Sequence, residues 1–145
     1  MGQDRVTDTT IAEAVRAWAR GMYPTEAAAE LLIRHGRTIY DGAPWLERHG
    51  DIVSIDPEKL QDASGAWSGG ERRIVDIAVS LLGDHPVDLA DAISGLDRDH
   101  LALVLAALAH AGGSHQHTDL RYDESGQVVG FGRDPLPPLF PWPAS

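Results

Sequence analysis

Three histidines and one aspartate lie within a stretch of ten residues: His110, His115, His117 and Asp119. In an extended chain His115 and His117 would share one face, because side chains alternate sides along a strand. Two or three imidazoles with a carboxylate are chemically suited to Zn²⁺ or Ni²⁺. Their spacing matches no specific metal motif, and the glycine pair at 112–113 is typical of a solvated turn. The four residues are therefore weak metal candidates, and we expect no bound metal or other cofactor.

Two tetrapeptides, Ser68–Glu71 and Ser94–Asp97, resemble the signature and D-loop of ATP-binding cassette ATPases. Such an ATPase also needs a glycine-rich loop whose lysine holds the β- and γ-phosphates. The sequence has a single lysine, Lys59, and no glycine loop precedes it. We therefore interpret Ser68 and Asp97 as helix N-caps and predict no nucleotide hydrolysis.

No other residue pattern indicates catalysis. The chain has no cysteine, which excludes thiol nucleophiles, thiolate metal sites and disulfides. A catalytic triad cannot be assigned either, because the spacing of serines and histidines along a chain does not show which side chains meet. We expect a protein that is not an enzyme.

The charge balance is strongly acidic, with 22 acidic residues against 12 lysines and arginines and a formal net charge of −10. Such a surface lacks the positive field that draws a protein to nucleic acid or to anionic lipid. The first residues show no secretory signal pattern, and no run of about 18 apolar residues predicts a membrane span. We expect a cytoplasmic location and no membrane partner.

Residues 1–67 are predicted to form a helical N-terminal region. A cap at Thr9–Thr10 starts one helix, and a second helix of the same hairpin ends near Gly36. Glycines and prolines then interrupt the apolar pattern. We expect only a short strand around Asp51–Ile55 and a short helix after Pro57 in this part.

Residues 68–133 follow the order helix, helix, helix and two-stranded hairpin, which is the order of a winged helix. The five prolines of residues 134–145 predict an extended tail. The expected fold class is therefore mainly α: an N-terminal helical hairpin, a winged-helix-like three-helix module with a β-hairpin wing, and a Pro-rich C-terminal arm. An unrelated helical bundle with a hairpin is the alternative. The helices are expected at 68–82, 87–93 and 97–111, and the strands at 118–122 and 127–131.

One segment of this module also resembles a known family. The run from His117 to Gly132, which ends Tyr-Asp-Glu-Ser-Gly-Gln-Val-Val-Gly-Phe-Gly, is similar to the wing that closes the N-terminal winged-helix domain of alkylmercury lyases. The similarity in layout covers about residues 72–132 and implies a winged-helix fold there. Those enzymes cleave a carbon–mercury bond with two cysteines and an aspartate in the following domain. This chain has no cysteine and ends thirteen residues after Gly132, so the resemblance implies the fold without the activity.

The third helix of the expected module is apolar nearly all round, so it needs burial on more than one side. A second copy of the chain or another protein can cover it, and tryptophans supply large anchors for such a contact. The residues that we assign to this interaction are Leu101, Val104, Leu105, Leu108, Trp18 and Trp142.

A winged helix can also read DNA with its third helix. In that case Arg98 and His100 would reach base edges and Arg121 the phosphate backbone, although neighbouring acids repel phosphate. The sequence therefore predicts first a non-catalytic interaction or regulatory module, which contacts itself as a homo-oligomer or binds another protein. A DNA-binding regulator, disfavoured by charge, and a metal- or ligand-binding relative of the alkylmercury lyase domain without its activity are the alternatives.

Overall fold

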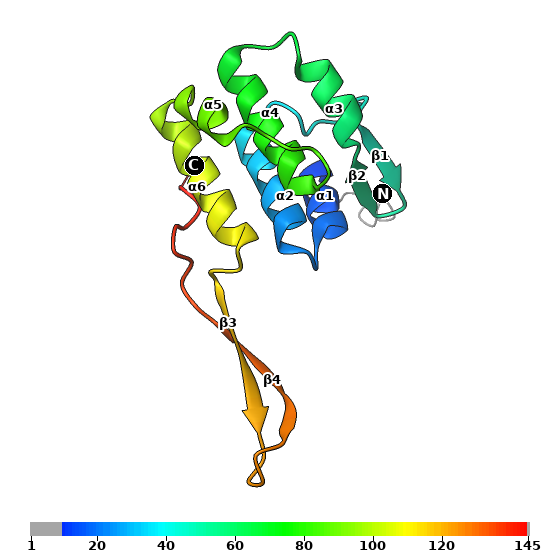
Figure 1. The fold of residues 1–145 in the computed structure, drawn as a ribbon. Coiled ribbons are helices and arrows are strands. Elements are labelled where there is room, and N and C mark those ends of the chain that lie inside the picture. The colour runs from blue at the N-terminus through cyan, green and yellow to red at the C-terminus, as the bar shows by residue number, and fades with distance from the viewer. Residues whose placement is uncertain (1–9, 145) are drawn as a thin grey trace.

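The computed structural model describes residues 10–144, except for the side chains of Thr118 and Asp119. In this part of the chain six helices and four strands form a helical body and a projecting hairpin (Figure 1). The helices are α1 (Ile11–Ala19), α2 (Tyr23–His35), α3 (Pro57–Ser64), α4 (Gly69–Leu82), α5 (Leu89–Ser94) and α6 (Arg98–Ala111). The strands are β1 (Leu46–His49), β2 (Ile52–Ile55), β3 (Gln116–Tyr122) and β4 (Val128–Pro135). Within these residues no helix combines the length and apolar character needed to cross a membrane.

Side-chain caps determine where most of the helices begin. In each case an oxygen of the cap residue accepts the backbone N–H three residues further on, which satisfies a donor that the helix leaves unpaired. The caps are Thr10, Asp56, Ser68, Asp88 and Asp97. The sequence prediction of caps at Ser68 and Asp97 is confirmed. α2 has no such cap, but it ends at Gly36, whose φ of 82° is the left-handed conformation that glycine adopts without strain.

α2 lies at the centre of the helical body, with α1, α4 and α6 packed around it (Figure 1). Its residues Ala27–Ala29 are all buried, and such small side chains let neighbouring helices approach from more than one side. Leu31 and Leu32 of the same helix have no exposed surface. Buried side chains from all six helices and from β2 belong to one core cluster around this helix.

β1 and β2 form an antiparallel hairpin in the register Leu46↔Ile55 to His49↔Ile52. Val53 and Ile55 of β2 are buried, and this strand packs against α1. The predicted strand around Asp51–Ile55 is thus confirmed. β1 is missing from the prediction, because its sequence Leu-Glu-Arg-His lies mostly exposed and has no apolar alternation.

β3 and β4 form a second antiparallel hairpin that starts beyond the C-terminal end of α6 and projects away from the helical body (Figure 1). The ladder runs from Gln116↔Pro135 to Tyr122↔Val128 and has an irregularity at Arg121/Tyr122. The Pro-rich segment 136–144 contains no helix or strand. It returns to the helical body, where Trp142 packs against the core.

The expected mainly α fold with a three-helix winged-helix module is wrong. The described chain is a mixture of helices and two small antiparallel sheets, and one of these sheets packs on α1. α6 has its most extensive contact with α2, in the N-terminal half, and only lesser contact with α4. The helices that correspond to the expected module therefore do not enclose a core of their own. The physical reason is that α6 buries its apolar surface against α2. The local sequence pattern shows that this surface must be buried but does not specify which helix covers it.

We predict that Leu32→Ala lowers the free energy of unfolding by about 2–5 kcal/mol, because it opens a cavity beside the central helix. Denaturant unfolding followed by tryptophan fluorescence and by far-UV circular dichroism should show one shared transition in both the wild type and the variant. Leu139→Ala is the matched control, since Leu139 is 86% exposed and its truncation should change stability by no more than about 0.5 kcal/mol. Separate transitions for the two halves of the chain would contradict the single core.

Candidate functional site

The β3–β4 hairpin carries an exposed apolar face. Residues directly opposite each other in an antiparallel ladder point to the same face. The pairs Leu120↔Phe131 and Tyr122↔Val128 therefore share a face, and these four side chains and Val129 are each more than half exposed. The two strands pack chiefly against each other, so the helical body does not cover this face. A contiguous exposed apolar patch of this kind is often a binding surface.

The opposite face of the hairpin has a different chemistry. Gly130 and Gly132 of β4 carry no side chain there, and the guanidinium of Arg121 occupies the space where a Cβ on Gly132 would lie. Arg121 thus lies across the ladder over Gly132. Only one face of the hairpin is therefore apolar, and this asymmetry gives the hairpin a defined contact side.

A cluster of rings fastens the base of the hairpin to the helical body. The His110 and His115 rings stack with their centroids 4.2 Å apart, and Tyr23 of α2 meets His115 edge to face at 4.6 Å. The Tyr23 hydroxyl donates a hydrogen bond to the side-chain oxygen of Gln116. Burial lowers the pKa of His115, and the neighbouring His110 lowers it further, while Glu26 opposes these effects. The cluster joins α2, α6 and the first residue of β3.

The metal candidates of the sequence are only partly brought together. The rings of His110 and His115 are in contact, but they stack with an angle of only 6° between their planes. In this arrangement their nitrogens do not point at one common position. His117 lies further along β3 opposite Asp134, and the side chain of Asp119 lies outside the described residues. Within the part of the chain that the structure describes, no three His, Asp or Glu side chains are grouped as metal ligands.

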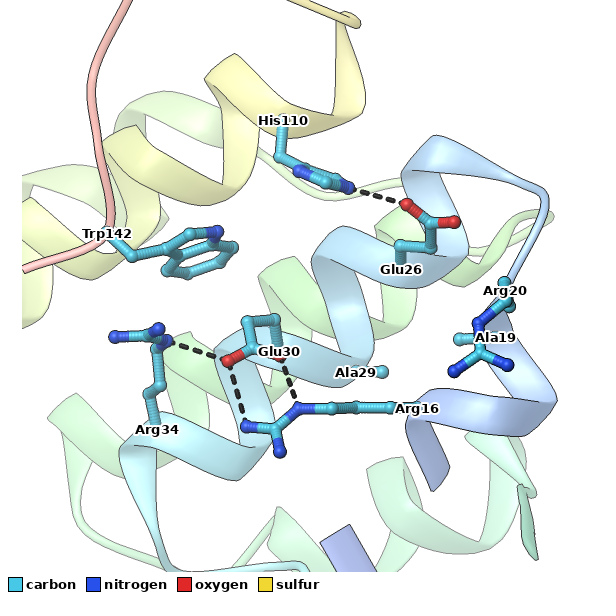
Figure 2. Close-up of a pocket in the computed structure, with 9 residues that line it drawn as sticks. All are labelled: Arg16, Ala19, Arg20, Glu26, Ala29, Glu30, Arg34, His110 and Trp142. Carbon is cyan, nitrogen blue, oxygen red and sulfur yellow. Dashed lines mark hydrogen bonds and ion pairs between the residues drawn. The ribbon is translucent and has the colours of Figure 1, made fainter. Parts of the chain in front are cut away.

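A pocket of about 420 Å³ lies beside this cluster, between α1, α2, α6 and the C-terminal segment. Figure 2 shows Arg16, Glu30 and Arg34 below the indole of Trp142, and the carboxylate of Glu26 pointing toward the ring of His110. Its volume is in the range of sites that hold small molecules. The lining residues are Arg16, Ala19, Arg20, Glu26, Ala29, Glu30, Arg34, His110 and Trp142.

Glu30 is the electrostatic centre of this pocket. Its carboxylate accepts two hydrogen bonds from Arg16, at 2.8 and 3.1 Å, and a third from Arg34 at 2.8 Å (Figure 2). Burial alone would raise the pKa of Glu30, but the two guanidinium groups outweigh it and hold that pKa below its ordinary value. The bidentate contact ties α1 to α2, because Arg16 and Glu30 belong to different helices.

Glu26 forms the second charged contact of the pocket. Its carboxylate is 2.7 Å from Nε2 of His110 and also accepts the backbone N–H of Gly21 at 2.9 Å. Burial raises the pKa of Glu26, but the Gly21 N–H and His110 together bring it below its ordinary value. Arg34 lies over Trp142, with its guanidinium carbon 5.1 Å from the ring centroid, and donates to the carbonyl of Pro143 at 3.0 Å. The C-terminal segment is therefore held in place as one wall of the pocket.

The three residues considered for DNA contact do not share a surface. Arg98 is in the first turn of α6, whereas Arg121 lies along the hairpin that extends beyond the opposite end of that helix (Figure 1). The ring of His100 packs edge to face on His35 at 5.1 Å, and its Nδ1 lies 3.3 Å from the Asp97 carboxylate. His100 is thus engaged within the fold.

The apolar residues of α6 divide between core and surface. Val104 is fully buried, and Leu101 is partly buried, whereas Leu105 and Leu108 are 39% and 37% exposed. The other two residues assigned to an interaction, Trp18 and Trp142, pack against the core cluster. Their indoles therefore contribute mainly to packing within one chain.

Sequence reasoning missed both the hairpin face and most of the pocket. A signal for the pocket exists, because Arg16 and Arg20 are spaced i, i+4, and Glu26, Glu30 and Arg34 continue that spacing on the next helix. Charges at this spacing are also typical of a solvated helix face. The packing of α1 on α2 turns the two charged stripes toward each other, which the sequence alone does not reveal.

Comparison with protein-family models, with curated proteins and with solved structures gives no match. The resemblance of residues 72–132 to the N-terminal domain of alkylmercury lyases therefore stays a prediction.

We predict that Glu30→Gln lowers the free energy of unfolding at neutral pH by about 1 kcal/mol, because it leaves two partly exposed arginines without their acid. The pKa of Glu30 is lower in the folded chain than in the unfolded one, so its contribution is complete above its unfolded pKa and is lost as the pH falls through the folded pKa. Denaturant unfolding should therefore show the difference between wild type and variant shrinking below about pH 4.5.

Glu47→Gln is the control for this experiment, because Glu47 lies exposed on β1 and forms no ion pair with any residue in 10–144. Its stability should match that of the wild type to within about 0.5 kcal/mol at every pH. An equal loss in both variants, or a constant difference for Glu30→Gln down to low pH, would contradict the assigned role of Glu30.

Proposed function

We propose that this protein is a non-catalytic interaction module that associates with a second copy of itself through the apolar face of the β3–β4 hairpin. The observation that carries the proposal is the exposure of Leu120, Tyr122, Val128 and Phe131 on one face of a projecting hairpin, with Val129 exposed beside them at the irregularity of the ladder. The cytoplasmic location expected from the sequence belongs to the same proposal.

The size of the apolar face supports a protein partner. Given about 150–250 Å² for an aromatic side chain, the five side chains expose on the order of 500 Å². A stable interface buries about 800 Å² on each partner, so this face supplies most of what is needed.

The charges around the face favour a second copy, in an antiparallel arrangement of the two hairpins. The tip of the hairpin is acidic, with Asp123 and Glu124. Arg133 lies near the base on the apolar side, where its guanidinium carbon is 5.6 Å from the centroid of the Phe131 ring. Face-to-face packing about a two-fold axis brings each acidic tip over the arginine of the other chain.

Contact through the hairpins also reduces the repulsion between two acidic chains. A strand of seven or eight residues is about 25 Å long at 3.3 Å per residue. The helical bodies, which carry most of the charge, then lie more than one Debye length apart, which is about 10 Å at 0.1 M salt. Packing the two chains through α6 would bring these acidic bodies together.

We predict that the wild type is a dimer by light scattering on a size-exclusion column, and that the double variant Leu120→Thr, Phe131→Thr is a monomer. Threonine keeps the preference for a strand but removes most of the apolar area, which should raise the dissociation constant at least about 100-fold. Random-sequence duplex DNA at low salt should leave the wild-type elution volume unchanged.

Leu89→Gln is the control variant. Leu89 is 48% exposed and begins α5, which lies at the end of the helical body far from the hairpin (Figure 1), and glutamine is a good helix former. It removes an exposed apolar side chain without touching the proposed interface, and the variant should stay dimeric. A monomeric wild type, or a double variant that remains a dimer, would overturn the proposal.

A further inference from the structure

The pocket between α1, α2 and α6 has a surplus of positive charge in a protein that is acidic overall. Three arginines line it against two glutamates, although the whole chain carries −10. Glu30 pairs with Arg16 and Arg34, and the carboxylate of Glu26 contacts His110. Arg20, within residues 10–144, has neither an ion pair nor a side-chain hydrogen bond. The surplus charge is thus located on one guanidinium with its donors available.

The same pocket has an apolar side. The indole of Trp142 faces the charged residues across the pocket in Figure 2, and Arg34 stacks on that indole. Ala19 and Ala29 line the side formed by α1 and α2, and their small side chains leave room there. An aromatic surface opposite small residues suits a flat ring, which can pack against the indole beside the guanidinium of Arg34.

We propose that this pocket binds a small aromatic monocarboxylate, with its carboxylate on Arg20 and its ring against Trp142. A guanidinium holds a carboxylate with two parallel N–H donors, which explains why an arginine without an acid suits this group. The hydrogen bonds of Arg16 and Arg34 to Glu30 remain intact, so the bound state needs no rearrangement of the existing ion pairs. The site is independent of the hairpin face proposed above.

The charge balance also selects a single negative charge over two. A monoanion neutralises the surplus of one positive charge left by three arginines and two glutamates. The second charge of a phosphate monoester would meet the carboxylates of Glu26 and Glu30 in the same pocket, and this repulsion opposes binding. The neutral amide of the same ring lacks the attraction to Arg20. Binding should therefore rank the carboxylate above both the amide and the phosphate.

The test is isothermal titration of the full chain with 2-naphthoate, 2-naphthamide and 2-naphthyl phosphate. We expect 2-naphthoate to bind at one site per chain and the other two compounds to bind at least tenfold more weakly. Arg20→Gln should weaken the binding of 2-naphthoate at least tenfold. Arg48→Gln is the matched control and should bind as the wild type does, because Arg48 lies on β1, outside the pocket lining, and donates a hydrogen bond to the carbonyl of Gly50.

A second readout locates the ligand. In a ¹H–¹⁵N spectrum, 2-naphthoate should shift the indole N–H signal of Trp142, assigned by its loss in Trp142→Phe, more than those of the other three tryptophans. No binding of 2-naphthoate at millimolar concentration, unchanged affinity in Arg20→Gln, or an equal loss in Arg48→Gln would each overturn the proposal. So would a ligand-induced shift confined to another tryptophan.

Discussion

The packing of α6 against α2 is the contact on which the rest of the structure depends. α6 is apolar nearly all round, and burial against the central helix removes the largest share of that surface from water. Because Ala27–Ala29 have small side chains, α1, α4 and α6 can all pack against α2 at the same time. If α6 packed elsewhere, the pocket would lose His110, and the hairpin would start from a different place.

This contact positions both proposed binding surfaces. The C-terminal end of α6 carries His110, which faces Glu26 in the pocket and stacks on His115 at the base of the hairpin. One side of α2 is therefore core, while its charged side lines the pocket through Glu26, Glu30 and Arg34. The returning C-terminal segment closes the same region with Trp142. The apolar face of the hairpin lies further out, where the helical body cannot cover it.

Local signals in the sequence predicted the elements well, because caps and turn glycines act over a few residues. Ser68, Asp97 and Gly36 mark helix ends both in the sequence and in the structure. The helix α6 and the β3–β4 hairpin also lie where the sequence predicts them. β1 escaped prediction because an exposed edge strand needs no apolar pattern. These cases concern local structure, which neighbouring residues decide.

The packing partners escaped prediction, because they depend on distant residues. The sequence of a helix that is apolar on all sides indicates that the helix is buried, but it does not indicate which element packs against it. The sequence therefore predicts α6 within a winged-helix module, whereas in the structure it packs against α2. The pocket was missed for a similar reason, since Arg16 and Glu30 meet only after α1 packs on α2. The apolar pairs of the hairpin were visible in the sequence as strand formers, but their exposure depends on where the hairpin points.

The central claim, that two hairpins pack antiparallel through their apolar faces, is tested most directly by measuring the distance between two hairpin tips. The chain has no cysteine, so Ser125→Cys places one spin label per chain at the turn. Double electron–electron resonance should then give one defined distance on the order of 25 Å, because each tip lies near the base of the other hairpin, about one strand length away. A label at Lys59→Cys on α3 should give a longer distance or none. A Ser125→Cys signal without a defined intermolecular distance would contradict the account.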